Sequence, residues 1–598
     1  MQKVKQAKKE AQKTSNYNNM GIIAIAVFAF FLFLKLRACD FLVGWDDDTY
    51  VVNNPAIQQI NWENLKKIFS SFYLGNYQPL SVLSYAIDFS IFKLKPSAYH
   101  IINLLFHIAN IFLVFKLFKK MQMSNVVCYT VAILFAIHPT RVESIAWIAE
   151  RKDVMYAMFY LLSIIYYLKF REEKNVKIYL ASLGLFLCSA LSKSMAITLP
   201  VVLILIDIFL DRKFDFKKTF NKIPFFVLSI VFGLLALYSQ GHESNAYKIA
   251  KDFSVFERVT LVFVAIGKYL VLIVAPFNLS AIQYYPIEPG EAMPIWAYLS
   301  MAGVIGLLFL GFKNKKYRFE IGFGLMFFFV SIGMVLQFVP FGHAIIAERY
   351  TYLPYLGLFF ILGVFIDQLL KNKNKATIVY FISTAFVLYL AAITYQRIAV
   401  WQNSITLFSD VVEKFPNTAN AYWYRGNAYR DYKALDKAIK DYTKAIELSP
   451  TYDAAYFNRA YSLAAQEKHE SALPDYDKSI ELNPNYAPAY LNKANSLYVL
   501  KRYDEAIQFY QKTISVDTSY QAAYLGLADI FVVKNEPTKA KPIYEQYLIK
   551  NPSDARAFNS LGIAQYNSNE QAQACESWEK AASLGNVPAR EFINKYCR

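Results

Sequence analysis

Eleven long apolar runs in the first two thirds of the sequence constrain the fold more strongly than any other feature. A helix of about 20 apolar residues is long enough to cross the hydrocarbon core of a bilayer. The composition agrees, because 56% of the residues are apolar and only 18% are charged. We therefore predict an all-α, multispan membrane protein. The predicted spans lie near residues 20–37, 99–118, 125–138, 153–170, 176–192, 195–211, 223–240, 293–312, 320–340, 350–370 and 376–397.

The basic residues predict the orientation of these spans. The net charge of +17 arises before Trp401, where 40 Lys and Arg face 23 Asp and Glu, against 23 of each after it. Basic loops alternate with the spans and share one side with the basic N-terminal segment 1–19, and such loops stay in the cytoplasm. An odd number of spans then places residues 401–598 outside. The basic loops are Lys116–Lys120, Lys169–Lys177, Arg212–Lys218, Lys313–Arg318 and Lys371–Lys375.

This charge pattern also limits the compartment and the partners. We expect an uncleaved first span in a bacterial inner membrane, or in the endoplasmic reticulum membrane of a eukaryote. No basic patch interleaved with aromatic residues suggests nucleic acid. The membrane domain is predicted over 20–400, with a first external loop at 38–98. Within it, 61–72 and 79–94 are expected to be interfacial helices, and 256–276 to be interfacial or re-entrant.

The period of the sequence changes after Trp401. Small and aromatic residues recur every 34 positions, the pattern of tetratricopeptide repeats, in which small residues lie where two helices touch. We predict an α-solenoid of five full repeats preceded by a half repeat. The recurring positions include Tyr422, Tyr456, Tyr490, Tyr524 and Phe558; Gly426, Ala460, Ala494, Ala528 and Gly562; and Tyr442, Tyr476, Tyr510, Tyr544 and Trp578.

Three adjacent carboxylates, Asp46, Asp47 and Asp48, follow the first span. Crowded carboxylates raise the pKa of at least one of them, which suits a general base. The alternative is a solvated acidic loop. Five cysteines show no metal-ligand spacing; Cys575 and Cys597 could pair in an oxidising compartment, but we favour two small core residues.

Other external loops carry ionisable residues that are costly at a membrane boundary and therefore candidates for function. Arg349, Lys193 and Arg141 could bind a phosphate, for which the planar guanidinium is well suited; snorkelling to the interface is the alternative. A second group could contact an acceptor or ligate a divalent cation, or could simply be ion-paired. This group comprises His138, Glu143, Glu150, Arg151 and Asp153. The stripe of His100, Asn103, His107 and Asn110 should face protein within its helix.

Several of these segments together resemble the transmembrane and tetratricopeptide repeat proteins, which include eukaryotic O-mannosyltransferases and bacterial relatives. The resemblance covers nearly the whole chain. It rests on Trp45-Asp46-Asp47-Asp48 with Asn54-Pro55, Tyr77-Gln78-Pro79-Leu80, Tyr99-His100 through Leu105, His138-Pro139 through Asp153, and Glu348-Arg349-Tyr350-Thr351-Tyr352-Leu353-Pro354.

The resemblance implies a GT-C glycosyltransferase fold whose first external loop carries the catalytic acid. The family's paired acidic motif matches Asp46 and Asp47, and Asp48 extends it, so the identity of the base stays open. The implied donor is a polyprenyl-phosphate sugar, the acceptor an extracytoplasmic protein hydroxyl, and the repeats would bind the acceptor or a partner. The alternative is a non-enzymatic membrane scaffold; against it, eleven spans exceed what an anchor needs.

Overall fold

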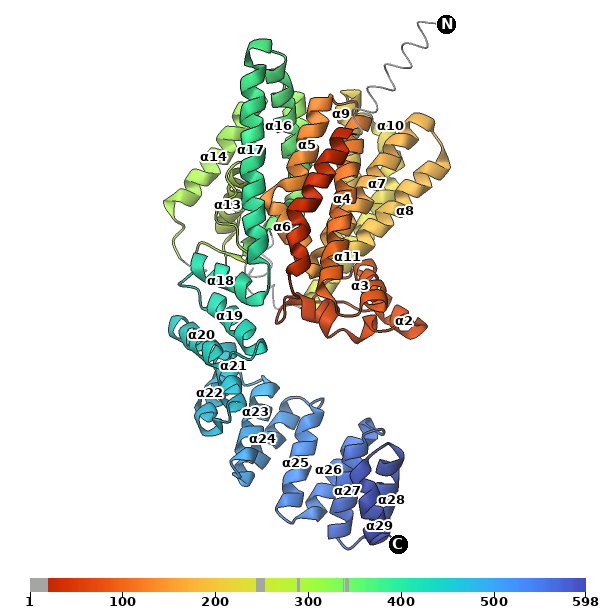
Figure 1. The fold of residues 1–598 in the computed structure, drawn as a ribbon, viewed down its shortest axis with the longest axis vertical. Helices are drawn as coiled ribbons and strands as arrows, with labels where there is room; N and C mark the ends of the chain where they lie inside the picture. The colour runs from red at the N-terminus through yellow and green to blue at the C-terminus, as the bar shows by residue number, and fades with distance from the viewer. Residues whose placement is uncertain are drawn as a thin grey trace. The chain divides into compact units, whose positions relative to one another are not determined.

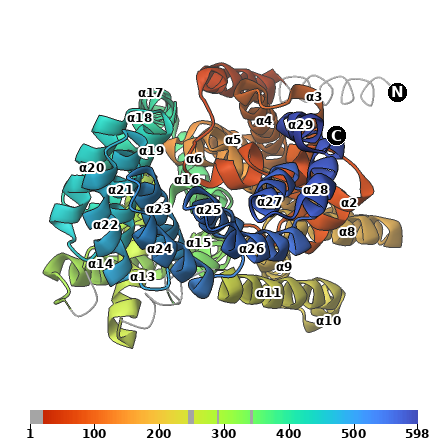
Figure 2. The same cartoon turned by 90° about the horizontal axis from the view of Figure 1, so that it is seen from below.

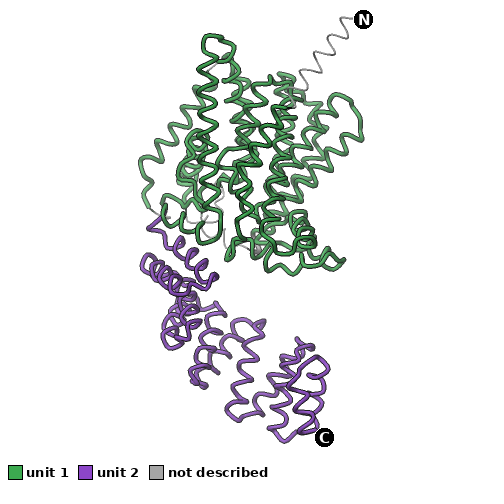
Figure 3. Tube along the Cα trace, viewed as in Figure 1, with its two compact units in different colours: residues 1–414 green, residues 415–598 purple. Residues whose placement is uncertain are grey.

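A computed structural model of the 598-residue chain describes residues 20–243, 253–287, 291–313, 315–336, 338 and 344–597, most of them helical (Figures 1 and 2). The strands within these residues, β1 (Gln283–Tyr284) and β2 (Ala344–Ile346), form one antiparallel pair. The all-α prediction is confirmed. The predicted basic segment 1–19 lies outside the described residues. The chain divides into two compact units, residues 1–414 and 415–598 (Figure 3).

Seven helical segments among the described residues are long and apolar enough to cross a membrane, or eight if one bent pair counts as a span. All coincide with predicted spans. The other predicted spans are the shorter apolar helices α8 (Val176–Ser192), α14 (Ile295–Lys313) and α16 (Tyr355–Leu370). The seven are Met20–Ala38; α4 (Pro96–Lys120); Ile148–Glu173, containing α7 (Arg151–Glu173); Ser194–Asp211, containing α9 (Leu199–Asp211); Phe216–Gln240, containing α10 (Phe216–Thr219) and much of α11 (Ile223–Glu243); Arg318–Val335, containing α15 (Arg318–Ile332); and α17 (Lys373–Val400).

The bent pair turns a short segment back into the helical unit. α5 (Asn125–Ile137) ends before His138-Pro139, and Pro139–Ala146, containing η4 (Pro139–Arg141) and α6 (Val142–Ala146), continues at 57°. Proline lacks the amide hydrogen and disfavours helical geometry in the preceding residue, so α5 cannot run on straight. Both η4 and α6 contact η9 (Glu348–Thr351). The bend therefore brings residues near 140 beside residues near 350.

The three segments expected at the interface are helices. α2 (Trp62–Ser70) packs on α3 (Pro79–Phe92), and the Asp88 that interrupts α3 pairs with Arg151 at 2.5 Å. α13 (Val255–Leu272) begins with a capping box of Ser254 and Glu257 and contacts α14 and β2. α13 is not among the helices apolar enough to cross a membrane.

The polar stripe on α4 faces protein, as predicted. His100, Asn103, His107 and Asn110 are all buried. His107 Nδ1 lies 2.8 Å from the Tyr352 hydroxyl, and Asn110 Nδ2 donates to the carbonyl of Val154 at 2.8 Å. These bonds tie α4 to α7 and to the segment after η9.

The second unit consists of helices that follow one another as antiparallel pairs (Figures 1 and 2). Each pair turns through a residue with positive φ, and these residues, Lys433, Glu467, Lys501, Asn535 and Asn569, are 34 positions apart. A Cβ on Gly426 would lie 2.7 Å from the Tyr442 ring, which explains the glycine there. The helices are α19 (Ala419–Asp431), α20 (Leu435–Leu448), α21 (Asp453–Ala465), α22 (His469–Leu482), α23 (Ala487–Val499), α24 (Tyr503–Val516), α25 (Gln521–Val533), α26 (Pro537–Lys550), α27 (Ala555–Asn567), α28 (Gln571–Ser583) and α29 (Val587–Tyr596). The predicted half repeat is α18 (Ser404–Lys414), which belongs to the first unit.

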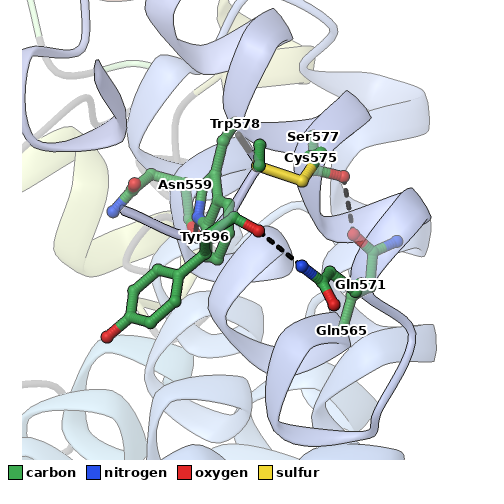
Figure 4. Close-up of a disulfide and its surroundings, with 8 residues drawn as sticks. Asn559, Gln565, Gln571, Cys575, Ser577, Trp578 and Tyr596 are labelled. Carbon is green, nitrogen blue, oxygen red and sulfur yellow. Dashed lines mark hydrogen bonds between the residues drawn. A yellow bond between two sulfur atoms is a disulfide. The ribbon is translucent and has the colours of Figure 1, made fainter. Parts of the chain in front are cut away.

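A disulfide joins Cys575 of α28 to Cys597, just after α29 (Figure 4). The interpretation of these residues as unpaired core cysteines was wrong. The sequence hid the pairing because the two residues are 22 positions apart and approach only when α29 folds back on α28. Trp578 lies in the apolar cluster against which Cys597 packs and donates to the carbonyl of Asn559 at 3.2 Å.

Candidate active site

The three aspartates of the first external loop have different surroundings. Asp47 is fully buried, and its two oxygens accept backbone hydrogen bonds from Leu42 at 2.9 Å and from Ala149 at 2.8 Å. Asp48 accepts from the backbone of Gly44 at 2.6 Å. Asp47 thus fastens the loop to the segment that precedes α7. Such bonds hold a carboxylate in place and occupy its lone pairs.

Asp46 is the member of the triplet that projects toward charged groups. It is partly exposed, and among the described residues its carboxylate accepts no hydrogen bond. Burial raises the pKa of Asp46 above the ordinary 3.8, while Lys152 lowers it, Glu150 raises it and Arg349 lowers it. The same desolvation raises the pKa of Asp47 to about 7, although the two backbone bonds lower it. A carboxylate with a raised pKa and free lone pairs suits a general base.

Arg349 is held in one orientation by a carboxylate of α6. Its Nη1 lies 2.5 Å from Glu143 Oε1, and its backbone amide donates to Glu143 Oε2 at 2.9 Å. Its Nε lies 3.4 Å from Glu150 Oε1. The guanidinium also covers the ring of Trp147 at 5.4 Å. The bend at Pro139 is what brings Glu143 of α6 within reach of η9.

Two lysines complete the cationic part of the cluster. Lys193 forms an ion pair with Asp153 and lies 3.3 Å from Glu150 Oε2. Lys152 lies 3.0 Å from Glu150 Oε1. Side-chain exposure is 18% for Arg349, 11% for Lys193 and 8% for Lys152, so Arg349 is the cation that a ligand reaches most easily. We call Asp46, Glu143, Glu150, Lys152, Asp153, Lys193 and Arg349 the Asp46 cluster.

Besides Asp47 and Asp48, three sequence candidates lie outside this cluster. Arg141 is fully buried and donates to the backbone oxygens of Tyr352 at 2.5 Å and Thr351 at 2.9 Å. His138 is buried as well, with Nε2 3.2 Å from the carbonyl oxygen of Ile273. Arg151 pairs with Asp88. Each of these three side chains joins segments inside the unit, so none is available to a ligand at the cluster.

The sequence reasoning missed Lys152 and the tryptophans beside it. Trp45 stacks on Trp147 with ring centroids 3.9 Å apart, and Trp401 lies 6.4 Å from Trp45. This stack connects the aspartate loop to α6 and to the end of α17. Lys152 was hidden within the run Glu150-Arg151-Lys152-Asp153, whose members point to different sides of the helix start. Four charges at the start of a span were the signal available.

A second network of ion pairs stabilises the segment that carries Arg349. Glu348 is buried and pairs with Arg397 of α17 at 2.8 Å, and Arg397 pairs with Asp410 of α18 at 3.0 Å. Burial raises the pKa of Glu348 to about 7, partly offset by Arg397. These pairs link α18 to the residue that precedes Arg349. The described residues contain no group of three or more His, Cys, Asp or Glu side chains arranged to hold a metal ion.

Fold and site together define a multi-pass helical membrane protein with a charged cluster at one end of its spans and a tetratricopeptide repeat array. Models of the tetratricopeptide repeat match residues 386–418, 426–466, 457–521 and 500–562. Partly similar solved structures are MamA (23% identity, TM-score 0.27, 30% of this chain and 96% of MamA) and the tetratricopeptide protein YrrB (17%, 0.30, 31% and 97%).

Among curated proteins, the chain is similar to protein O-mannosyl-transferases of the transmembrane and tetratricopeptide repeat type. One from Caenorhabditis elegans is 23% identical over 72% of this chain and 63% of the relative. Protein O-mannosyl-transferase TMTC3 of Homo sapiens is 23% identical over 67% of this chain and 48% of the relative. The predicted resemblance is confirmed. The chain spans between about half and two thirds of the length of these relatives.

Proposed function

We propose that the chain is an inverting glycosyltransferase of the GT-C type that moves a hexose from a polyprenyl-phosphate carrier to a hydroxyl group outside the cytoplasm. The relatives' names suggest mannose as the hexose and a protein oxygen as the acceptor atom, for which we propose Ser or Thr hydroxyls. The observation that carries this proposal is the position of the Asp46 carboxylate, without a hydrogen bond among the described residues, beside Lys152 and Arg349 at the end of the spans.

Asp46 would act as the general base. It removes the proton from the acceptor hydroxyl, whose oxygen attacks the anomeric carbon from the face opposite to the phosphate. The bond between that carbon and the phosphate oxygen breaks, and the phosphate departs with the electron pair. The configuration at the carbon is inverted, and Asp46 holds the proton that the acceptor lost.

Arg349 and Lys193 would stabilise the departing phosphate. Charge grows on the phosphate oxygens as the bond breaks, and fixed cations in a water-poor site stabilise such charge strongly. Glu143 would keep the guanidinium oriented through its two bonds to Arg349. Arg141 is not assigned a donor role, since its guanidinium is committed to backbone oxygens.

The repeats would bind the acceptor protein or a partner, and the basic loops would lie in the cytoplasm. Disulfides persist in oxidising compartments outside the cytoplasm, so the Cys575–Cys597 bridge supports an extracytoplasmic repeat unit. The membrane would be a bacterial inner membrane or an endoplasmic reticulum membrane. A divalent cation is not required by this mechanism.

The test is transfer by the purified chain in lipid vesicles. Polyprenyl-phosphate mannose is the donor, and a Ser/Thr-rich peptide or exported proteins from cells lacking the chain are the acceptors. We expect hexose on Ser or Thr by mass spectrometry, and we expect at least about 100-fold less with the Asp46→Asn variant. If the wild-type chain neither modifies these acceptors nor consumes the donor, the proposal fails and the scaffold interpretation gains. Loss of hexose from exported proteins in the deletion strain provides a second readout.

A further inference from the structure

A groove separate from the Asp46 cluster lies at the end of the first span. It has a volume of about 570 Å³ and runs between Leu34–Ala38, the turn that follows α3, and the first turns of α4. Its walls include Leu34, Phe92, Ile101 and Ile102, and two cations, Arg37 and Lys95, border it. The Leu34–Ala38 turn packs directly on α4. None of the residues of the Asp46 cluster lines this groove.

The two cations that border the groove are available to a ligand. Neither Arg37 nor Lys95 forms an ion pair with any residue in the described part of the chain, and both are exposed. By contrast, Lys120 pairs with Glu172 at 2.6 Å and Arg212 with Glu320 at 2.8 Å at the opposite ends of the spans. Arg37 and Lys95 also lie at the end away from the basic loops, where the charge pattern of membrane proteins disfavours cations. An anion bound at this place would account for both observations.

We propose that this groove binds one anionic phospholipid of the surrounding bilayer. The phosphate lies between Arg37 and Lys95, and the upper parts of the acyl chains lie against Leu34, Ile101 and Ile102. The groove sits where Met20–Ala38 ends and α4 begins, which is the depth at which lipid headgroups meet helix ends. Basic pockets between membrane helices bind anionic headgroups at the cytoplasmic side, and the same pairing of charges is proposed here for the opposite end. A soluble anion would gain nothing from the apolar walls.

The residues that line the groove favour a bilayer phospholipid over the isoprenoid donor as its ligand. A donor must reach a general base, and the groove contains no carboxylate. Three further apolar side chains from the same stretches of the chain, Ile91, Leu94 and Leu105, are exposed. The lipid would therefore act as a fixed component of the protein surface beside the first external loop.

The experiment is native mass spectrometry of the full chain released from nanodiscs that contain phosphatidylglycerol and phosphatidylcholine in equal amounts. We expect one retained phosphatidylglycerol per chain. The double variant Arg37→Ala/Lys95→Ala should reduce apparent affinity about 25-fold, because each cation near the headgroup contributes a factor of about five. Lys66→Ala, an exposed lysine of α2 outside the groove, is the matched control and should retain the lipid. Ala98→Trp, which fills the groove and keeps both cations, should also abolish retention.

Three outcomes would overturn the proposal. Equal retention by the double variant and by Lys66→Ala would remove the phosphate assignment. Equal retention of phosphatidylcholine would show that charge plays no part. Displacement by polyprenyl monophosphate at much lower concentrations than by phosphatidylglycerol would make the groove a donor site instead. Because retention is measured without turnover, it remains informative even if the transferase proposal fails.

Discussion

Ion pairs are arranged differently in the two units. In the repeat unit they recur with the fold: Arg425 pairs with Asp441 at 2.7 Å and Arg459 with Asp475 at 2.6 Å, each pair 16 residues apart and each joining a partly exposed arginine to a buried aspartate. In the membrane unit, charged side chains from distant segments gather in the Asp46 cluster. Each repeat pair is one local contact between one cation and one carboxylate, whereas Glu150 of the cluster faces Lys152, Lys193 and Arg349 at once.

Gathering several buried charges in one place is costly, because each one must lose its hydration. The Asp46 cluster contains Glu143 at 0% and Glu150 at 3% side-chain exposure. A fold that needed only stability would fill that space with apolar side chains. The comparison therefore points to chemistry in the membrane unit and to regular scaffolding in the repeat unit. Four predictions test it, beginning with the largest expected effect.

Replacing Asp46 and Asp47 by asparagine should separate chemistry from structure. Asp46→Asn should lower transfer by about two to four orders of magnitude, the usual cost of losing a general base, with normal folding. Wild-type activity should fall as the pH decreases through the raised pKa of Asp46, since the base is then protonated, and this acid limb should vanish in Asp46→Asn. Rates across pH and thermal melting are the measurements.

Asp47→Asn should behave differently, because an amide can accept from one of its two backbone partners but opposes the other with its NH₂ group. We expect a lower melting temperature together with reduced activity. If Asp46→Asn melts early and turns over normally when folded, the two roles are reversed and Asp47 is the base.

Arg349 should show the next largest effect. Arg349→Ala should reduce turnover by about 100-fold or more, as for other groups that stabilise charge in a transition state. Arg349→Lys should retain part of the activity, since it keeps the charge but loses the bond geometry with Glu143. Donor affinity measured alongside turnover distinguishes this role from snorkelling, in which case both variants would behave alike. Lys193→Ala would then be the next variant to test.

The sequence predicted the repeats and the membrane spans better than the arrangement of the charged cluster, and the reason is physical. The 34-residue period follows from contacts between helices that are neighbours in sequence, so Gly426 opposite Tyr442 could be read locally. The apolar runs are equally local. The aspartate loop and the Asp46 cluster depend on contacts between residues far apart in sequence, 102 positions for Ala149 with Asp47 and 206 for Arg349 with Glu143. Residue type alone could nominate Arg141 and Arg349 alike; only the fold separates a guanidinium bound to backbone oxygens from one beside the aspartate loop.

Trp578→Ala should affect the repeat unit and leave the membrane unit intact. Trp578 is 1% exposed and packs with Ala574, Ala581 and Ala589. Removing a buried tryptophan costs about 3–5 kcal/mol, and in a solenoid each repeat contacts only its neighbours. Hydrogen exchange should therefore accelerate in α27 to α29 alone. An equal loss of protection in α4 and α7 would show that the two units unfold together.

The substitution with the smallest expected effect on stability tests on which side of the membrane the repeat unit lies. Lys468 is exposed between α21 and α22, and Lys468→Cys should change stability by less than about 0.5 kcal/mol, as for most surface substitutions. If the spans are odd in number, a membrane-impermeant maleimide should label this cysteine in intact spheroplasts. The wild-type chain is the control, because Cys39 and Cys128 are buried, Cys188 is only partly exposed, and Cys575 and Cys597 are joined.

Labelling that requires lysis would place the repeats in the cytoplasm. It would also leave the disulfide in a reducing compartment, where it would not persist. The basic loops and the Cys575–Cys597 bridge are independent observations, and both place the repeat unit outside the cytoplasm. The labelling experiment therefore tests both at once.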